Sequence, residues 1–192
     1  MKYLNSIMLV AAVSLTACGS SEASLEDLQE SADALYERID LMEATLLSDM
    51  PTTGSARYEG VGAYSGTTAD PDSIMANPSS YSNVDVNVNF ASGQVTGSAY
   101  NFKSAADDAT IDGEITINGN VSGNTIVGTF SGSLQESIDT GDVSVSANVA
   151  YNGMVEGAFA GDNADAIAAQ LIGVGTVSGE AIPVYGIFGA EK

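Results

Sequence analysis

Carboxylates are the commonest side chains in this sequence that could carry out acid–base chemistry. The 192 residues include 25 Asp and Glu, and two of them, Asp112 and Glu114, lie two apart in a segment with the alternation of a β-strand. Two carboxyl groups on one strand face could act as the acid and the base of glycoside hydrolysis. Such an enzyme also needs a cleft and usually aromatic sugar platforms, and the chain has no Trp. We therefore predict no catalytic residues and no enzymatic activity.

Other chemistry is limited by the residues that are missing. The chain has no His and a single Cys, which excludes Ser-His-Asp and Cys-His catalysis, zinc sites built on nitrogen or sulfur, and internal disulfides. The acidic turns Asp107-Asp108 and Asp139-Thr140-Gly141-Asp142 could offer oxygen ligands to calcium, but neither has the spacing of an EF-hand loop. We interpret both as solvated turn carboxylates and predict no metal and no cofactor.

The charge balance also restricts the partners. Five Lys and Arg oppose the 25 acidic residues, which gives a net charge of −20. Nucleic-acid binding depends on clustered basic side chains, and Arg38, Arg57, Lys103 and Lys192 are scattered along the chain. We expect no nucleic-acid partner. Basic partners or cations would suit such a surface, although solubility in a salty medium is the simpler interpretation.

The single cysteine ends a segment typical of protein export. Lys2 precedes a short apolar run from Ile7 to Val13, and Leu15-Thr16-Ala17-Cys18 follows. A charged start, a short apolar core and small residues before a cleavage point indicate a signal peptide, and the run is too short to span a bilayer. The tetrapeptide resembles the lipobox of bacterial lipoproteins, in which the cysteine becomes the acylated N-terminus. We predict a signal peptide over residues 1–17, lipidation of Cys18 and a lipidated tether over residues 18–24.

The resemblance to lipoproteins also predicts a location. Gly19 and Ser20 follow the cysteine, and neither is the Asp that marks inner-membrane retention in lipoproteins of the enteric type. We predict an outer-membrane protein that is held in the membrane through Cys18, at the cell surface or on the periplasmic face. The alternative is an ordinary secreted protein in which Cys18 is incidental.

An amphipathic helix is predicted over residues 25–50. Ser24 and Asp27 can form a capping box, and Pro51 stops the helix. The apolar positions recur every three or four residues, as in a coiled-coil seam: Leu25, Leu28, Ala32, Leu35, Ile39, Met42 and Leu46. The seam either packs on the rest of the chain or pairs with other copies as a stalk. Three heptads are few for a free coiled coil, which favours packing within the chain or a weak oligomer.

Residues 55–192 have the alternation and the turn residues of an all-β domain. Asn152-Gly153 is the strongest turn signal and predicts a hairpin. Gly161-Asp162-Asn163-Ala164-Asp165 predicts the start of a short helix with Asp162 as its N-cap. The predicted strands are 56–64, 84–90, 94–102, 110–117, 125–134, 143–151, 154–160, 173–178 and 183–188.

The strand faces indicate a soluble barrel with an apolar interior. Val84, Val86 and Val88 share one face, whereas Asp85 and Asn87 share the other. A lipid anchor would be redundant on a membrane-spanning barrel, and the Tyr and Phe residues do not gather at strand ends as girdles would. Eight strands enclose an interior just wide enough for side chains or one small ligand. The predicted fold is a soluble eight-stranded antiparallel β-barrel preceded by one amphipathic α-helix.

The C-terminal third carries a family resemblance. Gly157-Ala158-Phe159-Ala160-Gly161 and the final Tyr185-Gly186-Ile187-Phe188-Gly189-Ala190 resemble the closing segment of the β-barrel of transferrin-binding protein B and its relatives. In that family a Gly-x-Phe-x-Gly strand runs into a short helix, and the last strand ends in Phe-Gly-Ala. Gly128-Thr129-Phe130-Ser131-Gly132 repeats the first of these elements. The resemblance covers roughly residues 55–192.

The resemblance implies a single barrel on a lipid-anchored outer-membrane or cell-surface protein. Family members include binders of host transferrin, lactoferrin or factor H, haem-capturing proteins, and partners of surface-lipoprotein translocators. The transferrin-binding members have two lobes with a handle domain beside each barrel, whereas this chain has room for one barrel and no handle. The partners it implies here are the membrane, a protein or small-solute ligand, and an outer-membrane receptor or lipoprotein translocator.

The segment from Thr67 to Tyr81 is too long for a simple hairpin connection. Long ordered loops on rigid barrels often bind ligands, although a tolerated loop without a function is an equal alternative. We take five residues of this segment as the candidate ligand-binding set: Asp70, Asp72, Ile74, Met75 and Tyr81.

The combined prediction is a non-enzymatic lipoprotein whose barrel loops bind a partner. One alternative is a structural, envelope-organising lipoprotein that oligomerises through residues 25–50. Another is a lipocalin-like solute carrier, which requires a ligand-sized cavity among the inward Val, Ile and Phe side chains.

Overall fold

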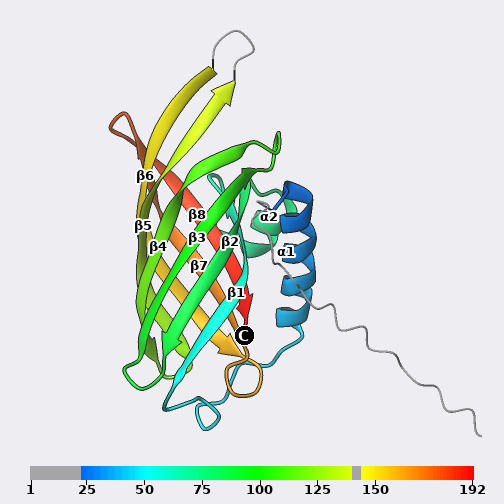
Figure 1. Ribbon diagram of the computed structural model, residues 1–192, viewed down its shortest axis with the longest axis vertical. Helices are drawn as coiled ribbons and strands as arrows, with labels where there is room; N and C mark the ends of the chain where they lie inside the picture. The colour runs from blue at the N-terminus through cyan, green and yellow to red at the C-terminus, as the bar shows by residue number, and fades with distance from the viewer. Residues whose placement is uncertain (1–22, 140–143) are drawn as a thin grey trace, which may run out of the picture.

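The computed structural model describes residues 23–139 and 144–192, so Cys18 and the predicted signal peptide lie outside the described residues. Eight strands close into a barrel in which every strand pairs antiparallel with its neighbours in sequence and β8 pairs with β1 (Figure 1). This confirms the predicted barrel and its N-terminal helix. The elements are α1 (Leu25–Asp40), β1 (Ser55–Ser65), α2 (Pro71–Ala76), β2 (Ser80–Asn89), β3 (Gln94–Ser104), β4 (Thr110–Ser122), β5 (Thr125–Asp139), β6 (Ser144–Ala160), β7 (Ala166–Val177) and β8 (Glu180–Glu191).

Side chains fill the interior of the barrel. The alternating apolar residues of β2, Val84, Val86 and Val88, are all buried there, as the sequence pattern predicts. Large aromatic rings occupy the rest of the space, and Tyr64 and Phe102 lie with ring centroids 5.3 Å apart. An eight-stranded barrel has room for such side chains and little more.

The predicted hairpin at Asn152-Gly153 is wrong, because β6 runs through both residues without a break. Gly153 pairs with Gly173 of β7, and the ring of Phe130 lies over this pair. A Cβ atom on Gly153 would lie 2.6 Å from Phe130 Cε1, and one on Gly173 would lie 2.7 Å from Phe130 Cζ. Gly153 is therefore needed for close approach inside the barrel, and this requirement outweighs the local turn signal.

The predicted short helix after Asp162 is also wrong. Residues 161–165 form a turn and Ala166 begins β7, whose inward residues Ile167 and Leu171 are buried. The turn folds back under the barrel, where the Tyr58 hydroxyl donates a hydrogen bond of 2.7 Å to the carbonyl oxygen of Ala164. The many Ala residues favour a helix locally, but strand pairing on both sides of β7 decides the structure.

Helix α1 begins as predicted and ends ten residues earlier than the predicted limit of residue 50. Ser24 and Asp27 form the capping box, and Leu41 is the C-cap. Beyond the helix, Ala44 forms a β-bridge with Ala160, so the chain turns to pair with the barrel. Neither described helix is long and apolar enough to cross a bilayer.

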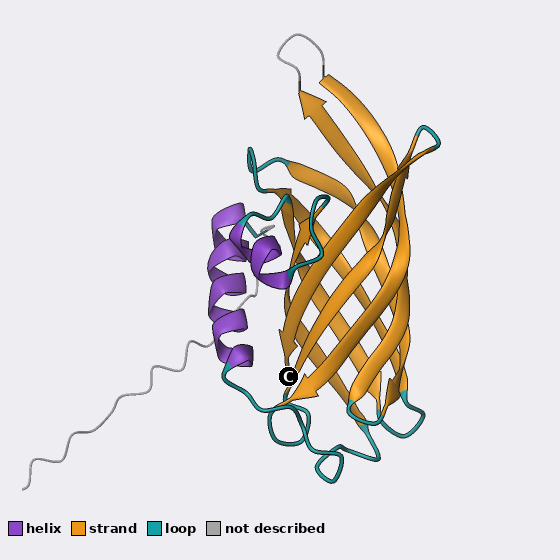
Figure 2. Cartoon of the chain, turned by 180° about the vertical axis from the view of Figure 1, so that it is seen from behind, coloured by secondary structure: helices purple, strands orange, loops and turns teal. Residues whose placement is uncertain are grey.

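A second core lies between the helices and the outside of the barrel. The buried face of α1, which includes Leu28 and Leu35, packs with Val61, Ala63 and Ile187 of the barrel. Figure 2 shows both helices on the same side of the barrel wall. Of the two predicted arrangements for the helix, the structure shows packing on the body of the same chain.

The two ends of the barrel differ. At the linker end, residues 41–54 cross beside the turns 91–93, 123–124 and 161–165. The Thr45 amide donates to Phe159 O (2.9 Å), and the Asn124 side chain donates to Thr45 O (2.8 Å). The α2 end consists of residues 66–79 with the turns 105–109 and 178–179. Beyond it, β5 and β6 project as a two-stranded hairpin (Figure 1).

Candidate functional site

Four of the five predicted ligand-binding residues, Asp70, Asp72, Ile74 and Met75, lie in α2 or at its N-cap, and the fifth, Tyr81, lies at the start of β2. Asp70 is the N-cap of α2, and its carboxylate accepts hydrogen bonds from the Ser73 amide (3.1 Å) and the Ser73 hydroxyl (2.5 Å). Pro71 occupies the first turn of α2, where its missing N–H costs nothing. Asp70 therefore has a structural role that holds this segment in one conformation.

The apolar members of the predicted set lie mainly in the second core. Ile74 is 1% exposed and Tyr81 is 5% exposed, and Met75 is partly buried against them. Tyr81 belongs to β2, which begins at Ser80, earlier than predicted. These side chains fasten the segment to the barrel, whereas Asp72 is exposed at the surface of α2. Ligand binding by the five residues stays a prediction.

The turn between β3 and β4 lies next to α1 at the α2 end. The backbone N–H of Leu25 donates to Asp108 Oδ1 at 3.1 Å, so this carboxylate adds to the cap of α1. Hydrogen bonds from the Ser104 hydroxyl and from the Ala109 amide lower the pKa of Asp107. Both carboxylates stabilise local structure. Among the described residues, no three His, Cys, Asp or Glu side chains are grouped so as to hold a metal ion.

The carboxylate pair considered for hydrolysis lies on the outside of the barrel. Asp112 and Glu114 are both exposed on β4, opposite Gln135 and Ser133 of β5. The structure thus places the pair on an outer face of the sheet and away from the filled interior.

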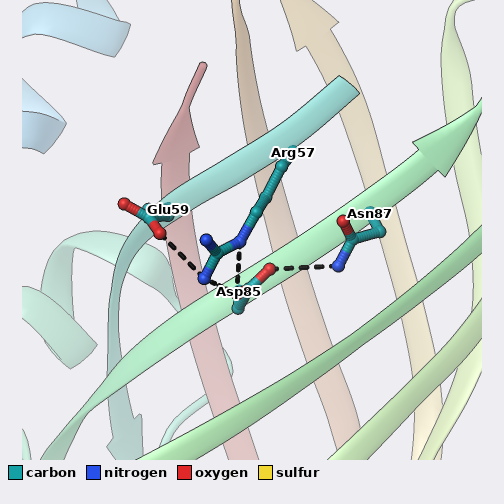
Figure 3. A network of polar contacts seen from close by, with 4 residues as sticks. All are labelled: Arg57, Glu59, Asp85 and Asn87. Atoms are coloured by element: carbon teal, nitrogen blue, oxygen red, sulfur yellow. Dashed lines mark hydrogen bonds and ion pairs between the residues drawn. The ribbon is translucent and has the colours of Figure 1, made fainter. Parts of the chain in front are cut away.

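The basic side chains are held by partners within the chain. Figure 3 shows Arg57 of β1, which donates to Asp85 (2.7 Å from Nε) and lies 2.8 Å from Glu59, while Asn87 also donates to Asp85. These carboxylates, Asp85 first, raise the pKa of Arg57. The other described cations have similar contacts: Arg38 with Glu191, Lys103 with Thr110, and Lys192 with Asp165.

The exposed side of α1 is strongly acidic. Five carboxylates are exposed on the side of α1 opposite its buried residues. They recur at helical spacing along its length: Glu26, Glu30, Asp33, Glu37 and Asp40. Like charges at this spacing slightly destabilise a helix, so the packing of the opposite, apolar side must maintain α1.

One outer face of the barrel is apolar, which the sequence patterns did not predict. Met154 is 54% exposed, and its cross-strand partner Ile172 is 51% exposed. Val174, the next outward residue on β7, is 39% exposed. Met154 and Val174 fall within the predicted strands 154–160 and 173–178, but Ile172 was left outside any predicted strand. The pairing of β6 with β7, which places these three residues on one outer face, was therefore not foreseen.

The comparison with protein families matches this barrel. Residues 50–192 match the family described as the C-lobe and N-lobe β-barrels of transferrin-binding protein B. The chain belongs to this family. The match covers all eight strands, and α1 lies outside the matched residues. No curated protein matches the sequence.

Solved structures of transferrin-binding protein B are similar to the chain. They include a double mutant of the protein from Haemophilus parasuis Hp5 (21% identity, TM-score 0.46), the intact Ap-TbpB with N and C lobes (21%, 0.44), and the isotype 1 protein from serogroup B Neisseria meningitidis (18%, 0.41). The alignments cover 77–78% of this chain. The chain spans only 28% of the length of each of these proteins.

The motifs that carry the family resemblance have clear positions in the barrel. Phe130 and Phe159, from the two Gly-x-Phe-x-Gly segments, and Phe188, from Phe-Gly-Ala, are all buried in the interior. Gly189 lies under α1, because a Cβ atom there would be 2.8 Å from Ile39 Cδ1. The glycine of this motif thus leaves room on the outside of this barrel for α1 to pack closely.

Proposed function

We propose that this transferrin-binding-protein-B-like barrel is a lipoprotein, anchored in the outer membrane through Cys18, that binds a protein partner at its α2 end and is not an enzyme. The observation that carries the proposal is the family match over residues 50–192. The export signal that ends at Cys18 supports the anchor.

The distribution of polarity supports a barrel that lies outside the bilayer. A membrane-spanning barrel presents an apolar belt to lipid and a polar lumen. Here the outer face carries Arg57, Glu59 and Asp85, and the interior is apolar. Val127, Met154, Ile172 and Ile182 are exposed on the neighbouring strands β5 to β8. Strands β1 and β2 carry charged side chains instead, so no apolar belt runs around the described part of the barrel.

The packing of the molecule favours a protein partner over the two alternatives. A solute carrier needs a cavity, and side chains such as Tyr64, Phe102 and Phe130 fill the interior. A helical stalk needs a free seam, and the seam of α1 is buried against the barrel. The partner is expected to be basic, because Asp72 is exposed at the α2 end, whereas Lys103, the described cation near this end, is only 9% exposed.

We do not extend transferrin binding to this chain. Transferrin appears in the names of relatives of which the chain spans 28%. The proposal names a binding end and a chemical type of partner, and leaves the particular protein to experiment.

Photo-crosslinking in cells tests the proposal. A photoreactive amino acid at Asp72 should give a discrete protein adduct, and the same amino acid at Ala91, exposed at the linker end, should not give that adduct. Asp49→Asn, added to the Asp72 variant, removes one more negative charge at the linker end and should leave the adduct unchanged. The absence of any adduct from Asp72, or the same adduct from both positions, would contradict partner binding at the α2 end.

A further inference from the structure

The start of α1 fixes which end of the barrel lies near the anchor. The helix begins at the α2 end, where the Leu25 amide is bonded to Asp108 of the β3–β4 turn. From there it runs along the barrel wall for 16 residues, or about 24 Å, and the linker continues to the opposite end (Figure 2). Any membrane anchor just before α1 is therefore attached at the α2 end.

The tether between the anchor and the helix is short. Five residues lie between Cys18 and the N-cap Ser24. The six steps from one residue to the other cover at most about 3.5 Å each in an extended chain, which gives about 21 Å. Strand β3, with 11 residues, spans the barrel between its two ends. At 3.3 Å per residue and a tilt near 40°, that height is about 28 Å. The tether is too short to run back along the barrel and bring the linker end to the bilayer.

Negative charge on the protein opposes an arrangement in which the side of the barrel covered by α1 lies flat on the membrane. That side carries the acidic residues of α1 from Glu26 to Asp40, which anionic headgroups repel. Acidic residues are also present at the α2 end, including Asp72, Asp107 and Glu180. Their repulsion acts over about one Debye length, near 8 Å, and so can hold this end off the headgroups while the tether still reaches.

We infer that the α2 end of the barrel faces the membrane across a gap no wider than the tether, so that the protein partner of this end binds between the barrel and the membrane surface. The linker end is then the face presented to the surrounding medium. This inference rests on the proposed anchor at Cys18 and gives the protein partner of the proposed function its location. A bulky soluble protein would meet the linker end first.

Thiol accessibility in vesicles tests the orientation. Cys18 is the only cysteine and its sulfur is blocked when lipidated, so one introduced cysteine is the only free thiol. Ala106→Cys lies at the α2 end and Ala91→Cys at the linker end, and both positions are exposed turn alanines. The lipidated full-length products are reconstituted in vesicles of phosphatidylethanolamine and phosphatidylglycerol. Each is treated with a small maleimide and with a polyethylene glycol maleimide whose coil is wider than about 20 Å.

The ratio of the two labelling rates gives the result. The small reagent measures the intrinsic reactivity of each thiol. The rate with the large reagent is divided by the rate with the small reagent at each position. This ratio should be roughly fivefold or more lower for Ala106→Cys than for Ala91→Cys. Equal ratios at the two positions, or slower reaction at Ala91→Cys, would overturn the orientation alone. Failure of the protein to float with the vesicles would instead overturn the anchor, and the orientation with it.

Discussion

At the scale of residues, contacts between aromatic rings and glycines determine how tightly the barrel closes. The Phe130 ring occupies the space that Gly153 and Gly173 leave open, and Tyr64 does the same over Gly62 and Gly186. The sequence shows these glycines but does not show which ring covers them, because most of the contacts join different strands: Phe130 lies on β5, Gly153 on β6 and Gly173 on β7. The same limit explains why Asn152-Gly153 was mistaken for a turn.

Gly153→Ala should destabilise the barrel. The new Cβ atom would lie 2.4 Å from the carbonyl oxygen of Ile172 and 2.6 Å from Gly173 Cα, both of which are backbone atoms. We expect a loss of about 1–3 kcal/mol in the free energy of unfolding, measured by urea denaturation. Gly66→Ala is the control, because its Cβ would meet only Pro183 O at 3.8 Å. Equal stability of the two variants would contradict this account of the interior.

Two buried tyrosines should respond differently to loss of their hydroxyl groups. The Tyr36 hydroxyl is buried without a hydrogen-bond partner among the described residues, and burial raises its pKa. Tyr36→Phe should therefore leave stability unchanged or raise it by about 1 kcal/mol. Tyr64 shares a buried hydrogen bond of 2.9 Å with Ser82, so Tyr64→Phe should cost about 1 kcal/mol or more. Urea denaturation measures the free energy of unfolding of both variants. A larger loss of stability in Tyr36→Phe than in Tyr64→Phe would show that the Tyr36 hydroxyl has an unrecognised partner.

The capping box of α1 should make stability depend on acid pH. Hydrogen bonds from the Ser24 hydroxyl and amide lower the pKa of Asp27 below its ordinary 3.8. A lowered folded-state pKa means that the ionised carboxylate stabilises the protein above pH 3.8 and that this contribution is lost as the pH falls through the folded-state value. The stability difference between wild type and Asp27→Asn should thus be constant near neutral pH and shrink in acid.

Urea denaturation at several pH values measures this difference. Glu26→Gln removes a charge from the same helical turn without breaking the capping box, and serves as the control. A difference for Asp27→Asn that stays the same or grows in acid would refute the role of the ionised cap.

Among the secondary-structure elements, α1 could be predicted from the periodicity of the sequence, but the residue at which it ends could not. The apolar repeat continues through Met42 and Leu46, yet Leu46 is 65% exposed and lies beyond the helix. The helix ends where the barrel wall ends, and the chain then pairs with Phe159 and Ala160. Such an end is set by the length of the neighbouring strands, which a local pattern does not contain.

Leu35→Ala should weaken the attachment of α1. Leu35 is 5% exposed in the second core, and truncation of a buried leucine costs about 2–5 kcal/mol. Leu41→Ala, at an 81% exposed position, should change stability by less than about 0.5 kcal/mol. Both variants should sediment as monomers, because the seam of α1 faces the barrel of its own chain. A dimer that dissociates in Leu35→Ala would support the stalk alternative.

At the scale of the whole molecule, the barrel was predictable because eight strands of alternating polarity must bury one face. The candidate site was less predictable. Asp70, Ile74 and Tyr81 stand out in the sequence for their position in a long loop, but the structure uses them for capping and packing. The position of the loop relative to the residues that precede α1 became visible only when α1 was placed along the barrel wall.

The proposed function depends on a lipid anchor at Cys18. Mass spectrometry of the mature protein isolated from membranes tests for this anchor. We predict that the mature chain begins at Cys18 and carries covalent lipid on that residue, and that Cys18→Ser remains unprocessed and without lipid. A mature chain that begins elsewhere, or one with an unmodified Cys18, would contradict the account.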